Sequence, residues 1–131
     1  MLFFLLPGNA MLRARFFISE VVMERHQRVR QQLQRVEQVL RQHEQWQNAA
    51  PPSSAFESTQ PFCMDTLAPY EWLQWVLIPR LHALLDAGAP LPQAFAVAPY
   101  YEMALEAGHA GRDAVLVTLF ELDALFTGDA Q

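Results

Sequence analysis

Several residue types and patterns that define common protein classes are missing from this sequence. It contains no lysine, which genome composition explains as readily as function, and a single cysteine, Cys63. One thiol excludes an internal disulfide and a cysteine-rich zinc site, and it is compatible with a reducing compartment. No apolar run reaches the roughly 18–20 residues of a membrane-spanning helix. The five glycines are scattered, so no glycine-rich loop is available to cradle a phosphate.

Patterns typical of catalytic and metal sites are also scarce. The four histidines form no HExxH motif, which excludes that type of zinc-protease site. Glu106 and His109 have the Glu-x-x-His spacing of ferritin-like metal helices, but those sites need two such pairs and two further glutamates. His82 and Asp86 lie one helical turn apart, and we interpret them as a structural pair. Cys63 lies between two apolar residues and is predicted to be a buried, unreactive thiol. We therefore predict no catalytic residue, no metal and no cofactor.

Composition and charge fit one acidic domain. The chain has 131 residues, of which 52% are apolar and 18% charged, so it can build a hydrophobic core. The net charge is −5, but residues 23–48 carry five arginines and three glutamates, whereas residues 49–131 carry two arginines and ten acids. An acidic body with one mildly basic segment argues against a dedicated nucleic-acid binder, whose surface is normally strongly basic.

Residues 1–22 differ in character from the rest of the chain. Their first apolar run, Leu2–Leu6, is short, has no basic region ahead of it and is broken by Pro7, so it makes a poor signal peptide. We predict that residues 1–22 are an N-terminal extension produced by an upstream start codon, with Met23 opening the domain of residues 23–131. A membrane-touching or partner-binding arm and an extension that packs on the domain are the alternatives.

An amphipathic helix is predicted from residue 23 to about residue 48. Its apolar residues recur at steps of four, three and four. At about 100° per residue, Arg28 and Arg35 fall on one flank of this stripe. Arg30 and Arg41 fall on the opposite flank. We interpret the arginines as solvated, and a surface that faces RNA or a protein partner is the alternative. The stripe consists of Val29, Leu33, Val36 and Leu40.

A loop is predicted to follow over residues 49–64. Its prolines end the first helix and keep the chain extended. A loop of this length without anchors is unusual in a compact domain, so Phe56 and Phe62 are expected to pin it to the core. Asp65 or Thr66 is then expected to cap the next helix.

The next helix is central to the fold and is predicted to end at Gly88. Pro79 lies inside it, where a proline removes one hydrogen bond and clashes with the preceding turn, at a cost of about 3 kcal/mol. Trp72 and Trp75 are three residues apart, so we expect two buried indoles on one face that offset this cost. The proline predicts a kinked helix.

Two shorter helices complete the prediction. Pro99 introduces a helix over residues 100–107, and another spans residues 112–126. Residues 91–98 could pass for a strand, but no partner strand is present, so we interpret them as a packed connector. Together with the two preceding helices, these segments predict an all-α, four-helix, bundle-like single domain with a proline-kinked central helix.

Aromatic residues form the best candidate for a recognition surface. Two tryptophans of the central helix are accompanied by two adjacent tyrosines in the next helix. Adjacent residues on a helix cannot share one face, so at least one tyrosine is expected to reach a rim or pocket. Packing of the cluster in the core is our main interpretation, and a contact with a ligand or partner is the alternative. With two arginines of the first helix, the candidate binding residues are Trp72, Trp75, Tyr100, Tyr101, Arg28 and Arg35.

The combination of STQPFCMDT, EWLQWVLIPR and FAVAPYYEMAL resembles the signature region of the YqcC-like family (DUF446) of small proteobacterial proteins. The resemblance covers about residues 23–130, and residues 1–22 have no counterpart in it. It implies a helical, bundle-like fold and a cytoplasmic protein without established activity. Members sometimes carry the label tRNA pseudouridine synthase C. Synthases of that kind are larger α/β enzymes with a catalytic aspartate, and no catalytic residue can be carried over to this chain.

Two functions are consistent with these patterns. The first is a non-enzymatic interaction or accessory module in the cytoplasm, bound to a protein partner. The second is an accessory factor in tRNA modification, which acts with a pseudouridine synthase and uses the arginines of the first helix. A small-ligand or metal-binding helical domain is a distant third. We predict a protein partner and no membrane association. RNA is a partner for which the sequence gives weaker support.

Overall fold

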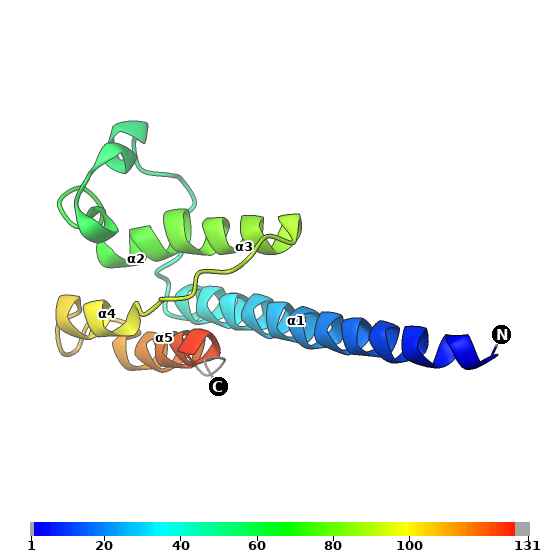
Figure 1. Ribbon diagram of the computed structural model, residues 1–131. Helices are drawn as coiled ribbons and strands as arrows, with labels where there is room; N and C mark the ends of the chain where they lie inside the picture. The colour runs from blue at the N-terminus through cyan, green and yellow to red at the C-terminus, as the bar shows by residue number, and fades with distance from the viewer. Residues whose placement is uncertain (1, 128–131) are drawn as a thin grey trace.

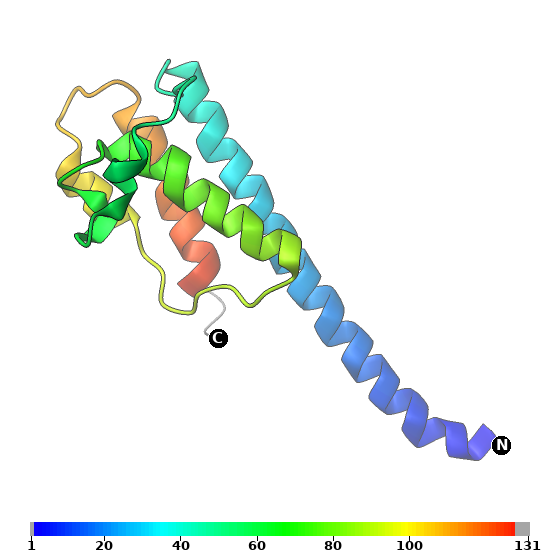
Figure 2. The same ribbon diagram turned by 90° about the horizontal axis from the view of Figure 1, so that it is seen from above.

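Helix α1 (Leu2–Gln42) is the longest element, and the other helices gather along its C-terminal half (Figures 1 and 2). The computed structural model describes the backbone of residues 2–127 and the side chains of residues 21–127. Every regular element of this part of the chain is helical, which confirms the predicted all-α, four-helix fold. After α1 come α2 (Pro69–Trp72), continued through a π-helical turn (Leu73–Leu77) into α3 (Ile78–Ala87), then α4 (Ala98–Ala104) and α5 (Arg112–Thr127).

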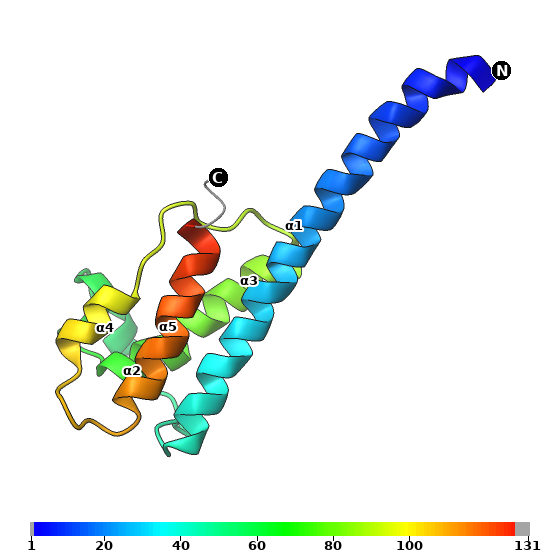
Figure 3. The ribbon, with the colours of Figure 1, turned by 90° about the horizontal axis from the view of Figure 1, so that it is seen from below.

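The core lies where α1 packs against α5 and against the continuous α2–α3 helix. Figure 3 shows α1 and α5 side by side, with α3 behind them. The predicted apolar stripe of α1 is confirmed, because its four residues have no exposed surface. Fully burying an aliphatic side chain contributes about 1.5–3 kcal/mol, so this seam is a main source of stability. One core cluster contains these stripe residues, Val29, Leu33, Val36 and Leu40, together with Val115, Leu119 and Leu122 of α5 and Leu73, Leu77 and Leu81 of the central helix.

Helix α1 begins well before the predicted start at residue 23. It starts at Leu2 and continues through Pro7, which ends the first apolar run of the sequence without ending the helix. This proline lies in the second turn, where its missing N–H leaves only the carbonyl of Phe3 without a helical partner. Among the described helices, none combines the length and apolar composition that a bilayer-spanning segment requires. The helix is continuous across residue 23, and the domain boundary there stays a prediction.

Helix α1 also ends earlier than predicted, at Gln42. Glu44 has a left-handed φ of 59°. Its N–H donates to the carbonyl of Arg41 at 3.0 Å, and the N–H of Gln45 donates to that of Leu40 at 2.8 Å. These bonds form a Schellman motif, in which the left-handed position is usually glycine. A glutamate there ends the helix at a cost of about 1 kcal/mol.

The interruption predicted at Pro79 takes the form of a π-helical turn. The N–H of Ile78 donates to the carbonyl of Leu73, five residues back, and this wider turn accommodates the proline ring. Trp72 and Trp75 are half-buried rather than buried as predicted, and the two rings contact different partners, Phe62 and Gln47. Each residue of a π turn rotates less about the axis than in an α-helix, which spreads residues three apart around the helix.

The central helix is capped by Glu71 rather than by the predicted Asp65 or Thr66. The Glu71 carboxylate accepts the backbone N–H of Ala68 at 2.8 Å and so closes the first turn. Asp65 and Thr66 bond within the preceding loop instead, and they help to fold it back on itself. That loop is more regular than predicted, because it contains 3₁₀ turns at Ser53–Glu57 and Pro61–Cys63.

Candidate functional site

The predicted binding residues occupy three separate places in the structure. One group forms an aromatic cluster between the central helix and α4. A second position lies in a groove between α1 and α3, and a third group is exposed on α1. The aromatic cluster contains Trp72, Tyr100 and Tyr101. Trp75 lies in the groove, and Arg28 and Arg35 are the exposed pair on α1.

Phe62 is at the centre of the aromatic cluster. Its ring stacks on Tyr100, with the centroids 4.0 Å apart and the planes 6° from parallel. It meets Trp72 edge-on at 4.8 Å and Tyr101 at 6.2 Å. Such ring pairs contribute about 0.5–1.5 kcal/mol each beyond their area burial. The sequence predicts Phe62 only as a loop anchor, because no local spacing relates it to the tyrosines of α4.

The backbone that presents Phe62 is strained. Phe62 and Cys63 have φ of 59° and 47°, both in the left-handed region, where a non-glycine residue costs roughly 1–2 kcal/mol. Two short hydrogen-bonded turns hold these conformations, since Cys63 N–H donates to Gln60 at 3.0 Å and Met64 N–H donates to Pro61 at 3.1 Å. The thiol of Cys63 is half-buried, less than predicted. The packing of the Phe62 ring therefore has to offset this strain.

The two adjacent tyrosines differ in burial, as the sequence predicts. Tyr101 has no exposed surface, and its hydroxyl donates to the carbonyl of Pro69 at 2.7 Å. Burial raises the pKa of Tyr101 far above its ordinary value, with a smaller contribution from the neighbouring Tyr100. Tyr100 is half-buried and reaches the rim of the cluster. The cluster is thus mostly core packing with one accessible tyrosine.

Helix α4, which carries both tyrosines, is held at its N-terminus by Asp123 of α5. The Asp123 carboxylate accepts the N–H of Val97 at 3.0 Å and the N–H of Ala98 at 2.9 Å. A carboxylate is favourable there because the first N–H groups of a helix have no partners within it. Burial raises the pKa of Asp123, and the two backbone hydrogen bonds lower it.

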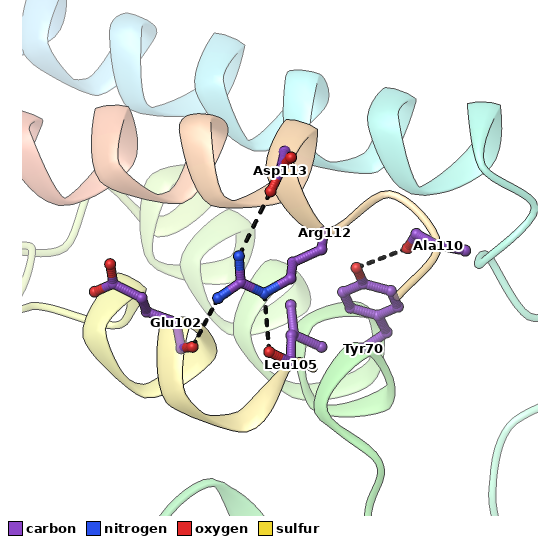
Figure 4. Close-up of polar contacts among 6 residues, drawn as sticks. All are labelled: Tyr70, Glu102, Leu105, Ala110, Arg112 and Asp113. Atoms are coloured by element: carbon purple, nitrogen blue, oxygen red, sulfur yellow. Dashed lines mark hydrogen bonds and ion pairs between the residues drawn. The ribbon is translucent and has the colours of Figure 1, made fainter. Parts of the chain in front are cut away.

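The C-terminus of α4 is held by Arg112, at the start of α5 (Figure 4). The guanidinium donates to the carbonyl of Leu105 at 2.8 Å and to that of Glu102 at 3.0 Å. A cation is favourable at the carbonyl end of a helix. Beside it, the Tyr70 hydroxyl donates to the carbonyl of Ala110 at 2.9 Å. Charges from α5 therefore fix both ends of a seven-residue helix, and with it the position of the tyrosines.

Trp75 lines a different feature, an open groove of about 500 Å³ between the end of α1 and α3. Trp46, Arg41, Pro79 and His82 also line it, and we call it the tryptophan groove. Its volume lies within the roughly 300–1,000 Å³ range of ligand-binding clefts. The two half-buried indoles give it an aromatic wall.

A hydrogen-bond network fixes Trp75 in the groove. Its indole N–H donates to the side-chain oxygen of Gln47 at 2.8 Å. The Gln47 backbone exchanges two hydrogen bonds, each 2.8 Å long, with the buried side chain of Gln74. The Gln47 amide also donates to Glu71 at 2.9 Å. The loop after α1 is therefore attached to the central helix, and Trp75 is oriented before any ligand binds.

Trp46 is the groove residue that the sequence analysis missed. It follows the end of α1, outside the apolar stripe, so helical periodicity assigns it no role. The Arg41 guanidinium lies over its ring at 4.8 Å from the centroid, and Glu37 accepts a hydrogen bond from Arg41 at 2.8 Å. Such a cation–π contact contributes about 0.5–1 kcal/mol at an exposed site and orients the ring.

Further along the same side of α1, Arg30 connects to α3. It donates to Asp86 at 2.9 Å and lies 3.4 Å from Nδ1 of His82. His82 and Asp86, which we interpret as a structural pair, therefore share Arg30 as a partner. The flank of α1 predicted to carry Arg30 and Arg41 faces α3 and the tryptophan groove.

The groove offers binding chemistry rather than an evident reaction. Its titratable side chains are engaged by neighbours, because Glu37 bonds to Arg41 and His82 contacts Arg30. Across residues 21–127, no three His, Cys, Asp or Glu side chains gather where they could hold a metal ion. Aromatic walls with a few fixed polar groups are typical of recognition sites.

Comparison with known proteins identifies the relatives of this chain. The "Uncharacterized protein YqcC" of Escherichia coli is 60% identical over 108 residues, which cover 82% of this chain and 99% of that protein. Its solution NMR structure has a TM-score of 0.72 with this fold and covers 82% of this chain and 92% of that one. An uncharacterised protein of Haemophilus influenzae is 43% identical over 77 residues, covering 59% of this chain and 73% of the relative.

One relative is much longer than this chain. The "tRNA pseudouridine synthase C" of Pectobacterium carotovorum is 49% identical over 73 residues, which make up 56% of this chain but 19% of that protein. Residues 28–125 also match a protein family described as "DUF446: tRNA pseudouridine synthase C". The family match and the near full-length likeness to YqcC agree with the predicted resemblance. The chain belongs to the DUF446 family.

Proposed function

We propose that this protein is a non-enzymatic interaction module that binds a protein partner in the tryptophan groove. The observation that carries the proposal is an open aromatic groove whose walls are fixed by the protein's own hydrogen bonds. Tryptophan and arginine are enriched among the residues that dominate binding energy at protein interfaces. A wall ordered in advance lowers the entropy cost of association.

The test is recovery of partners by the tagged full-length chain at native expression, with and without RNase. We expect a stoichiometric protein that survives RNase treatment. Trp46→Ala should abolish its recovery, and Trp46→Phe should restore part of it, because the aromatic wall returns. Met103→Ala, an exposed change on α4, is the matched control. The proposal fails if no stoichiometric partner is found or if Trp46→Ala leaves recovery unchanged.

A second candidate function is an accessory role in tRNA modification, beside a pseudouridine synthase. It is favoured by the Pectobacterium relative, in which the matching segment is about a fifth of a longer chain with that name. Joining two modules in one chain raises their effective concentration to about the millimolar range, which is useful when they work together. Both candidates imply a cytoplasmic protein.

This second function is tested with the pseudouridine synthase of the same organism. We expect the two purified proteins to bind, and binding should weaken when Arg28 and Arg35 are both changed to glutamate. Arg80→Glu, an exposed change on α3, is the control. No binding to the synthase or to its tRNA substrate would remove this candidate and leave the groove proposal standing.

A further inference from the structure

The ring of Phe62 fills a space between α4 and the central helix, and we call this space the phenyl slot. Tyr100 forms one wall, parallel to the Phe62 ring within 6°. Trp72 and Tyr101 meet the same ring edge-on, with interplanar angles of 65° and 87°. The aromatic walls therefore enclose a place for one six-membered ring. The tryptophan groove is lined by other residues, so the phenyl slot is a separate feature.

The backbone that delivers the ring to the slot is unfavourable. Phe62 and Cys63 are consecutive residues with left-handed φ, a conformation that is costly for any residue with a Cβ atom. This cost is subtracted from the stabilisation that the ring contacts provide. Strained residues of this kind are found at ligand clamps and switch regions. A phenyl ring on a relaxed chain would make the same contacts without the strain, so it would occupy the slot more favourably than Phe62 does.

The loop that carries Phe62 is folded by hydrogen bonds of its own. The Ser58 hydroxyl donates to the carboxylate of Asp65, and the Thr66 hydroxyl donates to a backbone carbonyl of the same loop. These bonds do not depend on the ring of Phe62. The turn is also at the surface, because Met64 is 47% exposed. A local movement of this turn would therefore open the slot to solvent and leave the rest of the loop folded.

Tyr100 offers a hydrogen bond to a chain that enters the slot. The hydroxyls of Tyr70 and Tyr101 each donate to a backbone carbonyl of the protein. Within the part of the chain whose side chains are described, the hydroxyl of Tyr100 has no such partner, and this residue is half-buried at the rim. A peptide in the slot brings backbone carbonyls, which are the acceptors that the other two tyrosines use.

We propose that the phenyl slot binds a phenylalanine side chain of a partner protein, which displaces Phe62. The present occupant defines the ligand, since it is a phenyl ring that follows a proline and an extended Gln60. A nucleobase is a poorer match, because it would bring polar edges into a slot whose contacts with its present ring are apolar. A Gln-Pro-Phe segment that is not held in the strained turn reproduces the ring and its approach.

The probe is the synthetic peptide acetyl-Gln-Pro-Phe-amide, with acetyl-Gln-Pro-Leu-amide as its matched control. Amide NMR titration of the full-length protein should show binding of the phenylalanine peptide, with shifts at the residues that line the slot. Phe62→Ala vacates the slot and should bind about tenfold more tightly, because no ring has to leave. Cys63→Gly relaxes the occupied state and should bind about threefold more weakly. Trp46→Ala should bind normally, which separates this site from the tryptophan groove.

Opposite effects of Phe62→Ala and Cys63→Gly are specific to displacement, because a ligand on the outer surface is affected by neither change in this way. The proposal is overturned if the unaltered protein does not bind the phenylalanine peptide, even where Phe62→Ala does, since a vacant cavity is not an exchange. It is also overturned if the leucine peptide or uridine 5′-monophosphate binds the slot equally well, or if Cys63→Gly binds as tightly as the unaltered protein. Should Phe62→Ala unfold, the Cys63→Gly comparison decides, because that variant keeps the ring.

Discussion

The ring of Phe62 lies flat on that of Tyr100, 4.0 Å away, although its backbone is left-handed. This contact joins the loop before the central helix to α4, so two segments distant in sequence share one aromatic cluster. The strain at Phe62 and the stacking at Tyr100 are opposing contributions to the same local structure.

Replacing Phe62 with alanine should destabilise the fold by about 2–3 kcal/mol, because the stacking and edge contacts are lost while the left-handed backbone remains. Equilibrium urea unfolding measures the change. Met64→Ala, at an exposed position in the same loop, should stay within about 0.5 kcal/mol of the unaltered protein. Equal effects of the two changes would show that the Phe62 ring contributes nothing specific.

Two helix ends give opposite predictions for glycine. Glu44→Gly should stabilise the protein by about 0.5–1 kcal/mol, since glycine adopts the left-handed end of α1 without strain. Gly88→Ala should destabilise it by about 1 kcal/mol, because Gly88 ends α3 with a left-handed φ of 65°. An added Cβ would meet no atom within 4 Å, so this cost comes from the backbone conformation alone. Thermal unfolding of both variants tests the pair, and shifts of the same sign would contradict the backbone explanation.

Gln74 should be needed to hold the tryptophan groove in shape. Gln74→Glu keeps an acceptor for the Gln47 N–H but places a carboxylate oxygen against the Gln47 carbonyl, and it should cost about 2–3 kcal/mol. Tryptophan fluorescence should change as Trp75 loses its fixed partner. Gln34→Glu, on the exposed side of α1, is the control. If Gln74→Glu changes neither stability nor tryptophan fluorescence, the network does not hold the groove in shape.

Asp123 predicts a pH dependence of stability. Burial raises the pKa of its carboxyl in the folded protein, so the folded state holds this proton more tightly than the unfolded chain does. The contribution of Asp123 therefore falls as pH rises from about 4, the ordinary aspartate value, through the folded pKa. The stability difference between the unaltered protein and Asp123→Asn should shrink over this range. Denaturant unfolding at several pH values measures it, and a difference that grows with pH would reverse the assignment.

Tyr70 predicts a loss of stability in alkali. Burial raises its pKa to about 12, although the charge of Arg112 lowers it. Above about pH 10 the unfolded chain releases the phenolic proton first, so the free energy of unfolding falls by about 1.4 kcal/mol per pH unit for each such tyrosine. Tyr70→Phe should reduce this slope. In the folded protein, tyrosinate absorbance should appear at a higher pH than in the unfolded chain. An unchanged slope would mean that Tyr70 titrates normally.

The helices that the sequence predicts well are those with a regular apolar period. The stripe from Val29 to Leu40 follows directly from spacing, and its burial confirms it. Helix ends are predicted less well, because they depend on local backbone geometry. Glu44 ends α1 in a conformation that its residue type does not favour, and α4 stops at Ala104 rather than at residue 107.

The candidate site could be predicted only in part, because its geometry depends on contacts between distant segments. Tyr100 and Trp72 come together through Phe62, whose left-handed backbone no sequence period reveals. Trp46 gains its position from Arg41 and from the loop that Gln74 holds. The bonds from Asp123 to α4 likewise join residues more than twenty positions apart. Apart from the local contact of Arg41 with Trp46, these are tertiary contacts, and periodicity carries no information about any of them.

The π-helical turn at Leu73–Leu77 sets the phase of everything after it on the central helix. This wider turn accommodates one extra residue, so winding the same residues as a regular α-helix would rotate the whole of α3 by about 100° relative to α2. His82 and Asp86 would then turn away from Arg30, and Trp75 and Pro79 would no longer face the same groove. The π-helical geometry of this turn thus decides which side of α3 meets α1.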